Sequence, residues 1–141
     1  MVIETGADGV HLGQGDSSPA QARAALGPNA IIGFSTHTLA QVEAAPLSSL
    51  SYLAFGPVFA SPTKSGHAEV NGLDELDRIS KSIKMPLVAI GGISPENAED
   101  VFRSGASSVA VISALRAAPS LPNAVENFRA AHARSQQDRF V

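Results

Sequence analysis

Five groups of residues in this 141-residue chain have side chains or backbone groups suited to anion binding. Each follows a short apolar run: Gly13-Gln14-Gly15-Asp16, Ser35-Thr36-His37, Ser61-Pro62-Thr63-Lys64, Gly91-Gly92 and Ser113. Backbone amides beside glycine, hydroxyl groups and an ammonium group bind phosphate oxygens, whereas a carboxylate binds a hard cation such as Mg²⁺. The five groups together indicate a site suited to anions.

Gly91-Gly92 has a local pattern typical of phosphate binding. The pair is followed by Ile93 and by Ser94-Pro95, which is a helix start signal, so free backbone amides and a positive helix end are expected together. Ser113 adds a hydroxyl and an amide after the last apolar run. Glycine pairs after strands also serve only to let a helix pack closely, and the residues alone leave both interpretations open.

Lys64 and Asp16 are the charged candidates. Lys64 is the only lysine among the first 80 residues, and its ammonium group can neutralise a phosphate or pyrophosphate oxygen. Asp16 can bind a magnesium ion that bridges pyrophosphate oxygens. A solvated loop lysine and a surface or capping carboxylate are the alternatives, because a helix is expected to begin at Ser18.

Two histidines lie in or beside the apolar runs. His11 is expected to point opposite to Val10 and Leu12 in an extended segment, and a hydrogen-bonded core residue is the favoured interpretation. His37 follows the second run, where it can face a ligand or cap the next helix with Thr38.

The elements that position these residues alternate between strand and helix. Continuous apolar runs such as Leu87-Val88-Ala89-Ile90 are typical of parallel strands buried on both faces, so the chain is assigned to the α/β class. We expect strands at residues 9–12, 30–34, 52–55, 87–90 and 109–112. We expect helices at 19–26, 39–45, 73–83 and 123–134, and one from Ser94-Pro95 to Gly105. Residues 1–134 are predicted to form one domain, followed by a fraying polar tail at 135–141.

Two local patterns refine this prediction. Ser18-Pro19 followed by Gln21 forms a capping box with proline at the first helical position, and Gly27 is suited to end that helix. The third and fourth strands are separated by a segment, residues 56–72, that is longer than a connection requires. Long loops in compact domains are usually functional or disordered, and the lysine and hydroxyl groups here favour function.

Composition excludes several classes of function. A hydrophobic content of 44% with 16% charged residues supports a substantial core. The net charge of -3 without a dense basic cluster argues against a nucleic-acid partner. The absence of cysteine excludes disulfides, thiolate catalysis and cysteine-bound zinc. No apolar run approaches the roughly 18 residues of a membrane span, and no signal peptide is recognised, so we expect a cytoplasmic protein without a membrane partner.

Five stretches of the chain, in order from about residue 5 to 115, resemble the thiamine phosphate synthase family. They are Gly6-Ala7-Asp8-Gly9-Val10-His11-Leu12-Gly13-Gln14, Ile32-Gly33-Phe34-Ser35-Thr36-His37, Gly56-Pro57-Val58-Phe59 with Thr63-Lys64, Val88-Ala89-Ile90-Gly91-Gly92-Ile93, and Ala110-Val111-Ile112-Ser113-Ala114. The resemblance implies a (β/α)8 barrel and a transferase that joins an aminopyrimidine methyl pyrophosphate to a thiazole ethyl phosphate, releasing pyrophosphate. It also implies a pyrimidine carbocation, with magnesium and lysine assisting the leaving group.

The resemblance implies a role for each matched residue. Asp16 resembles a magnesium-binding carboxylate, and Ser35 and Lys64 resemble the catalytic ligands of the pyrimidine pyrophosphate. The thiazole phosphate would be held by the matched loop Ser61-Pro62-Thr63, joined by Gly92 and by Ile112-Ser113. Gly15 stands where the family often has glutamate, and Ser61 stands where it often has threonine.

The length of the chain departs from the family. A barrel of this type has eight strands and upwards of about 200 residues, whereas the five strands predicted here resemble the fourth to the eighth. The family's first magnesium carboxylate and several pyrophosphate ligands would then be absent. Five unclosed strands expose two edges and an apolar inner face. We expect a fragment of a longer product first, or else a second polypeptide or a homo-oligomer that completes the barrel, and we expect this chain alone to be inactive.

Two other functions compete with the synthase. A thiazole tautomerase resembles this family, but it would have a histidine where Pro57 stands. A catalytically inactive binding or regulatory module would keep the thiazole phosphate pocket without the pyrimidine half. The absence of three β/α units favours the module, whereas Lys64 and Asp16 argue against it.

Overall fold

The computed structural model describes residues 5–60 and 70–137 and contains one parallel sheet of five strands. The strands are β1 (Gly9–Leu12), β2 (Ile31–Thr36), β3 (Tyr52–Phe55), β4 (Leu87–Ile90) and β5 (Ser108–Ala110). They are ordered β1-β2-β3-β4-β5, so each strand pairs with the next one along the chain. This order is that of a sector of a (β/α) barrel and not of a doubly wound sheet. The predicted α/β class and the partial barrel are confirmed.

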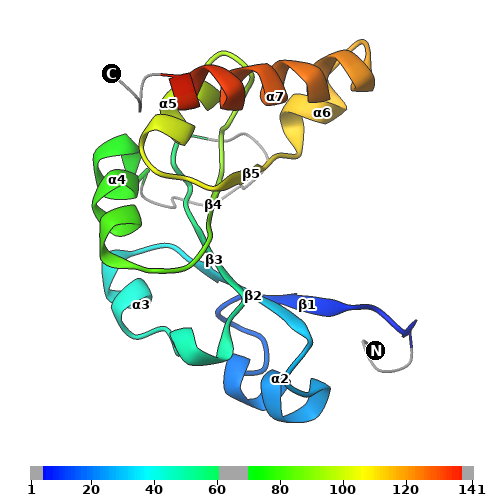
Figure 1. Ribbon diagram of the computed structural model, residues 1–141, viewed down its shortest axis with the longest axis vertical. Coiled ribbons are helices and arrows are strands. Elements are labelled where there is room, and N and C mark those ends of the chain that lie inside the picture. The colour runs from blue at the N-terminus through cyan, green and yellow to red at the C-terminus, as the bar shows by residue number, and fades with distance from the viewer. Residues whose placement is uncertain (1–4, 61–69, 138–141) are drawn as a thin grey trace.

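Helices cover one side of this sheet. They are α2 (Pro19–Leu26), α3 (Leu39–Glu43), α4 (Gly72–Ser82), α5 (Ala98–Arg103), α6 (Ser113–Arg116) and α7 (Leu121–Gln137), with a 3-10 helix, η1 (Leu47–Ser49). Figure 1 shows the elements as an arc, with the helices along its outer side. Among the described residues, no helix combines the length and the apolar character needed to cross a membrane.

The core lies between the sheet and these helices. Alternate strand residues such as Ile32, Leu53 and Leu87 are at most 1% exposed, and they pack with Leu76 and Ile79 of α4. Phe34, Leu53 and Leu87 are register partners across β2, β3 and β4, so they form one apolar row. Burial of this row holds the helices against the sheet.

The opposite face of the sheet is open. Ile31 is 51% exposed, while Val88 and Ile90 of β4 are only half-buried. The continuous apolar pattern predicted strands buried on both faces, and this is wrong for the described residues, because helices cover only the outer face. Closure of a full barrel would cover the second face, which explains why the pattern is apolar on both sides.

The start of α5 differs from the prediction. The helix begins at Ala98, whereas the Ser94-Pro95 signal predicted a start three residues earlier. The Ser94 amide donates to Asn97 Oδ1 at 2.8 Å, and the Asn97 side-chain amide donates to the Gly92 carbonyl at 3.1 Å. These bonds hold residues 94–97 in a turn, because local bonds between side chains and the backbone compete with helix formation.

The last strand and the last helix also differ. β5 ends at Ala110 instead of residue 112, because the Ile112 carbonyl already accepts the Arg116 amide of α6. The polar tail predicted from Ser135 is wrong for residues 135–137, which continue α7; residues 138–141 lie outside the described part. Ser135 is 1% exposed and donates to the His132 carbonyl at 2.7 Å.

Contacts with α5 explain the greater length of α7. The Phe102 and His132 rings meet edge to face at 4.8 Å, and Arg134 Nε lies 2.6 Å from Glu99 Oε2. Ala124, Phe128, Ala131 and Ser135 are buried at helical spacing. Packing against α5 therefore extends the helix beyond the point where its sequence becomes polar.

The capping box of α2 is confirmed. Ser18 Oγ accepts the Gln21 amide at 3.2 Å, and Gln21 Oε1 accepts the Ser18 amide at 3.0 Å. Two backbone donors at the helix start are thus satisfied reciprocally. Gly27 ends the helix with a φ of 85°, a conformation that favours glycine.

We expect Ser18→Ala to lower the free energy of unfolding by about 1 kcal/mol, because the Gln21 amide loses its acceptor. Chemical denaturation of this chain measures the effect. Ser17→Ala is the matched control, since the exposed Ser17 is the neighbouring serine outside the capping box. An equal loss in the two variants would show that the capping box does not stabilise the helix.

Candidate functional site

The carboxyl ends of the five strands lie at one edge of the sheet, because all neighbouring strands are parallel. We call this edge the rim. It carries the groups that follow the strands: Gly13–Asp16 after β1, Ser35 and His37 at the end of β2, Gly56 after β3, Gly91-Gly92 after β4 and Ile112-Ser113 after β5. The predicted residues Ser61, Pro62, Thr63 and Lys64 lie outside the described residues. The other predicted site residues therefore share one edge of the sheet.

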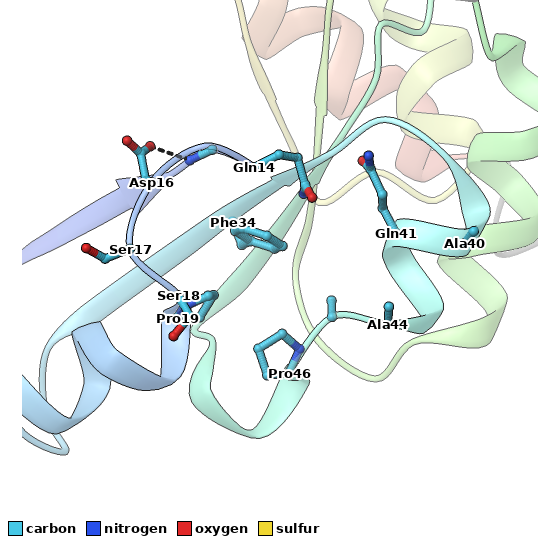
Figure 2. A pocket seen from close by; sticks show the side chains of 12 residues that line it. Gln14, Asp16, Ser17, Ser18, Pro19, Phe34, Ala40, Gln41, Ala44 and Pro46 are labelled. Atoms are coloured by element: carbon cyan, nitrogen blue, oxygen red, sulfur yellow. Dashed lines mark hydrogen bonds between the residues drawn. The ribbon is translucent and has the colours of Figure 1, made fainter.

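The loop after β1 holds Asp16 in a tight turn. Asp16 Oδ2 accepts the Gly13 amide at 2.7 Å, and the Asp16 amide donates to the Gly13 carbonyl at 3.2 Å. Gln14 Nε2 donates to the Ser35 carbonyl at 2.6 Å, which ties this loop to the end of β2. Figure 2 shows Asp16 extending from the loop with its hydrogen bond drawn.

The Asp16 carboxylate fits a cation ligand. It is exposed, and a carboxylate that accepts one amide retains other lone pairs for a metal ion. Within residues 5–60 and 70–137, no cluster of three or more His, Cys, Asp or Glu side chains could hold a metal. Asp16 therefore supplies one ligand, and magnesium binding stays a prediction.

His11, Ser35 and Tyr52 form a hydrogen-bonded cluster on the open face of the sheet. His11 Nε2 lies 2.8 Å from Ser35 Oγ, and His11 Nδ1 lies 2.9 Å from the Tyr52 hydroxyl. The His11 and Tyr52 rings are stacked, with centroids 5.6 Å apart. The prediction that His11 is hydrogen-bonded is confirmed. The prediction that it lies in the core is wrong, because His11 lies on the exposed face.

Gly33 explains how these side chains meet. It is the register partner of both His11 and Tyr52, so it lies between them on the same face of the sheet. A Cβ atom on Gly33 would overlap the Tyr52 ring and lie 2.6 Å from His11 Nδ1. Glycine at this position therefore allows residues of β1 and β3 to touch across β2.

The surroundings shift the pKa of two members of the cluster. Burial lowers the pKa of His11, and the negative charge of Asp16 opposes that shift. Burial raises the pKa of the Tyr52 hydroxyl. Near pH 7 both groups are therefore neutral, and the hydrogen bonds of His11 depend on its tautomer.

His37 contacts the segment after β3. Its Nδ1 lies 2.5 Å from the Gly56 carbonyl, and its own carbonyl accepts Asn71 Nδ2 at 3.1 Å. Thr38 caps the following helix α3 through a bond from the Gln41 amide. The histidine thus fastens two loops of the rim to each other.

The glycine pair after β4 allows close backbone approach. Gly91 and Gly92 have φ values of 88° and 65°, and the Gly91 carbonyl accepts the Phe59 amide at 3.1 Å. A Cβ atom on Gly92 would lie 2.6 Å from the Phe59 carbonyl oxygen. The close neighbours of the pair are Pro57, Phe59 and Ala60 in the segment after β3 and not a helix, so the glycines admit this segment. The helix start expected beside the pair is wrong, because α5 begins at Ala98. A phosphate role for Gly92 stays a prediction.

Ile112 and Ser113 complete the rim beside β5. Ile112 is 61% exposed, and Ser113 begins the short helix α6. Their contact with a ligand stays a prediction.

A hollow that sequence reasoning missed lies between α2 and α3. It has a volume of about 430 Å³ and is lined by residues that include Asp16, Pro19, Phe34 and Gln41 (Figure 2). Phe34 and Ser35 are successive strand residues, so their side chains point to opposite faces of β2. The hollow is thus separate from the His11 cluster.

The fold and the rim define a sector of a (β/α)8-barrel protein whose polar groups gather where such barrels bind their ligands. Comparison with known proteins then specifies the family. A family model described as "Thiamine monophosphate synthase" matches residues 1–115. The chain therefore belongs to the thiamine monophosphate synthase family, and the predicted resemblance is confirmed.

Individual relatives agree with this assignment. The chain is 43% identical to a thiamine-phosphate synthase of Azorhizobium caulinodans, over 92% of this chain and 61% of the relative. It is 47% identical to one of Psychrobacter sp., over 84% of this chain and 57% of the relative. The solved thiamine phosphate pyrophosphorylase from Pyrococcus furiosus is 36% identical, with a TM-score of 0.84 over 95% of this chain and 63% of that chain. The chain spans less than two thirds of the length of these relatives.

We expect stability to depend on the titration of His11. Its folded pKa lies below the ordinary value of 6.5, so the unfolded state binds the proton first. The contribution of neutral His11 is present above about pH 6.5 and is lost as the pH falls through the folded pKa. Denaturation of the wild type and of His11→Gln across this range measures the difference, and a difference independent of pH would contradict the prediction.

Proposed function

We propose that this chain supplies the fourth to eighth strands of a thiamine-phosphate synthase. That enzyme couples hydroxymethylpyrimidine pyrophosphate to thiazole ethyl phosphate and releases pyrophosphate. The observation that carries the proposal is the placement of Asp16, Ser35, Gly92 and Ser113 on one rim of a barrel sector whose family model covers residues 1–115. The relatives named as thiamine-phosphate synthases support the same activity.

The proposed reaction is a dissociative transfer. The bond between the pyrimidine methylene carbon and the pyrophosphate oxygen breaks, and its electron pair leaves with pyrophosphate. The thiazole nitrogen then donates its lone pair to the resulting carbocation and forms the new carbon–nitrogen bond. The protein's task is to stabilise the departing charge and to hold the nitrogen in line.

The residues of this chain divide between the two substrates in the proposal. Ser35 and Lys64 donate to the pyrophosphate as its charge increases, which lowers the barrier to departure. The thiazole phosphate is held by Ser61, Pro62, Thr63, Gly92, Ile112 and Ser113. Parallel pairing brings the described members of both sets to one edge, so the substrates can lie side by side.

Magnesium is the proposed cofactor, and Asp16 is its ligand in this chain. The bound ion would neutralise pyrophosphate oxygens. The bond from the Gly13 amide fixes the carboxylate at the rim, five residues after His11 in the chain. The exposed position of Asp16 leaves it accessible to a cation that also contacts a substrate.

Further β/α units are proposed to complete the barrel. The outer edges of β1 and β5 pair with no other strand among the described residues, and Ile31 remains exposed on the inner face. Pairing these edges and covering that face would bury apolar surface and supply the remaining ligands. A longer chain, a second polypeptide or a homo-oligomer could provide the missing elements, and we favour the longer chain.

The activity test is a chimera in which the part of the Azorhizobium relative that this chain does not match is joined to it. We expect the chimera to form thiamine phosphate and Lys64→Ala to lower kcat by about 100-fold, because an electrostatic donor to the leaving group is lost. Lys81→Ala is the matched control, since Lys81 is exposed on α4 and pairs with Asp77.

Three outcomes separate the competing functions. Equal rates for the Lys64 and Lys81 variants would contradict the role of Lys64. A folded chimera without turnover would contradict the synthase. Thiazole phosphate binding without turnover, measured by calorimetry, would support the binding-module alternative.

Metal removal tests the cofactor. We expect chelation to abolish turnover by the chimera and added magnesium to restore it. Asp16→Asn should raise the magnesium concentration for half-maximal rate by about tenfold or more, because a neutral amide binds a hard cation less tightly. Asp74→Asn, on the exposed first turn of α4, is the control. Full activity in the presence of chelator would exclude magnesium as the cofactor.

A further inference from the structure

A continuous chain of hydrogen-bonding groups crosses three neighbouring strands on the open face. It runs from the Tyr52 hydroxyl on β3 to His11 on β1 and from His11 to Ser35 Oγ on β2, with separations of 2.9 and 2.8 Å. Tyr52 and Ser35 therefore contact opposite nitrogens of one imidazole ring. The ring links the two hydroxyl groups and determines which way each of them points.

A neutral imidazole has one N–H group, so two arrangements are available. In the first, Nε2–H donates to Ser35 Oγ and the Tyr52 hydroxyl donates to Nδ1. The Ser35 proton is then free to point away from His11. In the second, Nδ1–H donates to the Tyr52 oxygen and the Ser35 hydroxyl donates to Nε2, so that Ser35 presents only lone pairs to its surroundings.

An anionic ligand distinguishes these arrangements. A phosphate or pyrophosphate oxygen needs a donor, and only the first arrangement offers it the Ser35 proton. The second arrangement would place the lone pairs of Ser35 against a negative charge. Anion binding at Ser35 therefore requires the Nε2–H tautomer of His11.

We propose that His11 is a positioning residue, held by Tyr52 in the Nε2–H tautomer, that turns the Ser35 hydroxyl proton toward a pyrophosphate oxygen of the substrate. The inference rests on the proposed function, because that function brings a pyrophosphate to Ser35. His11 acts through Ser35 and has no direct contact with the reacting atoms in this scheme.

Several contacts hold the side chains of His11, Ser35 and Tyr52 in one geometry. The stacked His11 and Tyr52 rings, inclined by 22°, fix the imidazole plane, and Gly33 leaves room for both rings. Gln14 Nε2 donates to the Ser35 carbonyl, which fixes the backbone of Ser35. Burial lowers the pKa of His11, so the neutral ring predominates near pH 7 although Asp16 opposes this shift.

The cluster differs from a hydrolytic Ser-His-Asp triad. In such a triad a carboxylate behind the histidine stabilises the imidazolium that forms when serine loses its proton. Here the group behind His11 is the Tyr52 phenol, whose pKa is raised by burial, so it remains neutral and offers no such charge. Asp16 is engaged with the Gly13 amide instead. The arrangement orients a donor and does not generate a nucleophile.

The tautomer can be measured without any ligand. Nitrogen-15 NMR of this chain near pH 7 should show the proton of His11 on Nε2, and Tyr52→Phe should shift the ring toward a mixture of tautomers. A dominant Nδ1–H form in the wild type would overturn the inference whatever the function of the protein.

The second measurement uses the active chimera and the pyrimidine pyrophosphate substrate. We expect His11→Leu to lower kcat/KM about tenfold or more, the loss typical of a hydrogen bond to a charged group. His11→Gln should recover most of this loss, because its amide N–H can reach Ser35 in place of Nε2–H. Tyr52→Phe should give a smaller loss, and circular dichroism checks that each variant is folded.

The outcomes separate this inference from the proposed function. If the wild-type and His11→Leu chimeras turn over with equal kcat/KM, the positioning role is overturned and the proposed synthase activity stands. A similar loss in the leucine and glutamine variants also overturns it, since a merely steric role would not distinguish them. If NMR shows the Nε2–H tautomer but the chimera has no turnover, both the proposed synthase activity and the role of His11 toward a ligand are overturned.

Discussion

Parallel pairing of the five strands in their sequence order places the core, the helices and the rim of this protein. It forces every strand to run in the same direction, so residues far apart in the sequence reach one edge. Asp16 and Ser113, which are 97 positions apart in the sequence, follow the two outer strands of the sheet at the same rim. Because each connection returns across the same side, the helices cover one face, and the other is left to the polar cluster.

The two faces of the sheet consequently have different roles. On the helix side, Ile32, Leu53 and Leu87 lose nearly all contact with water, which holds the units together. On the open side, β1 and β2 present His11 and Ile31 to solvent. In a closed barrel, that second face lines the interior, which explains how an apolar strand pattern and an exposed histidine can occur in one sheet.

Glycine determines how closely the functional groups approach each other. Gly33 admits two rings from the strands on either side of β2, and Gly92 admits the carbonyl of Phe59. In both places a methyl group would occupy space that a neighbouring group already fills. The glycines at this site therefore allow close approach of neighbouring groups, and the pair after β4 admits the segment after β3.

Short-range patterns and ordered motifs were enough to predict the α/β class, the order of the five strands, the capping box at Ser18 and the family. The folded structure was needed to show that Asn97 delays α5, that α7 continues through Ser135, and that His11 meets Ser35 and Tyr52 on the open face. Those contacts join residues up to 41 positions apart. They depend on strand register and on which face a helix covers, and neither is visible in the local pattern of a single segment.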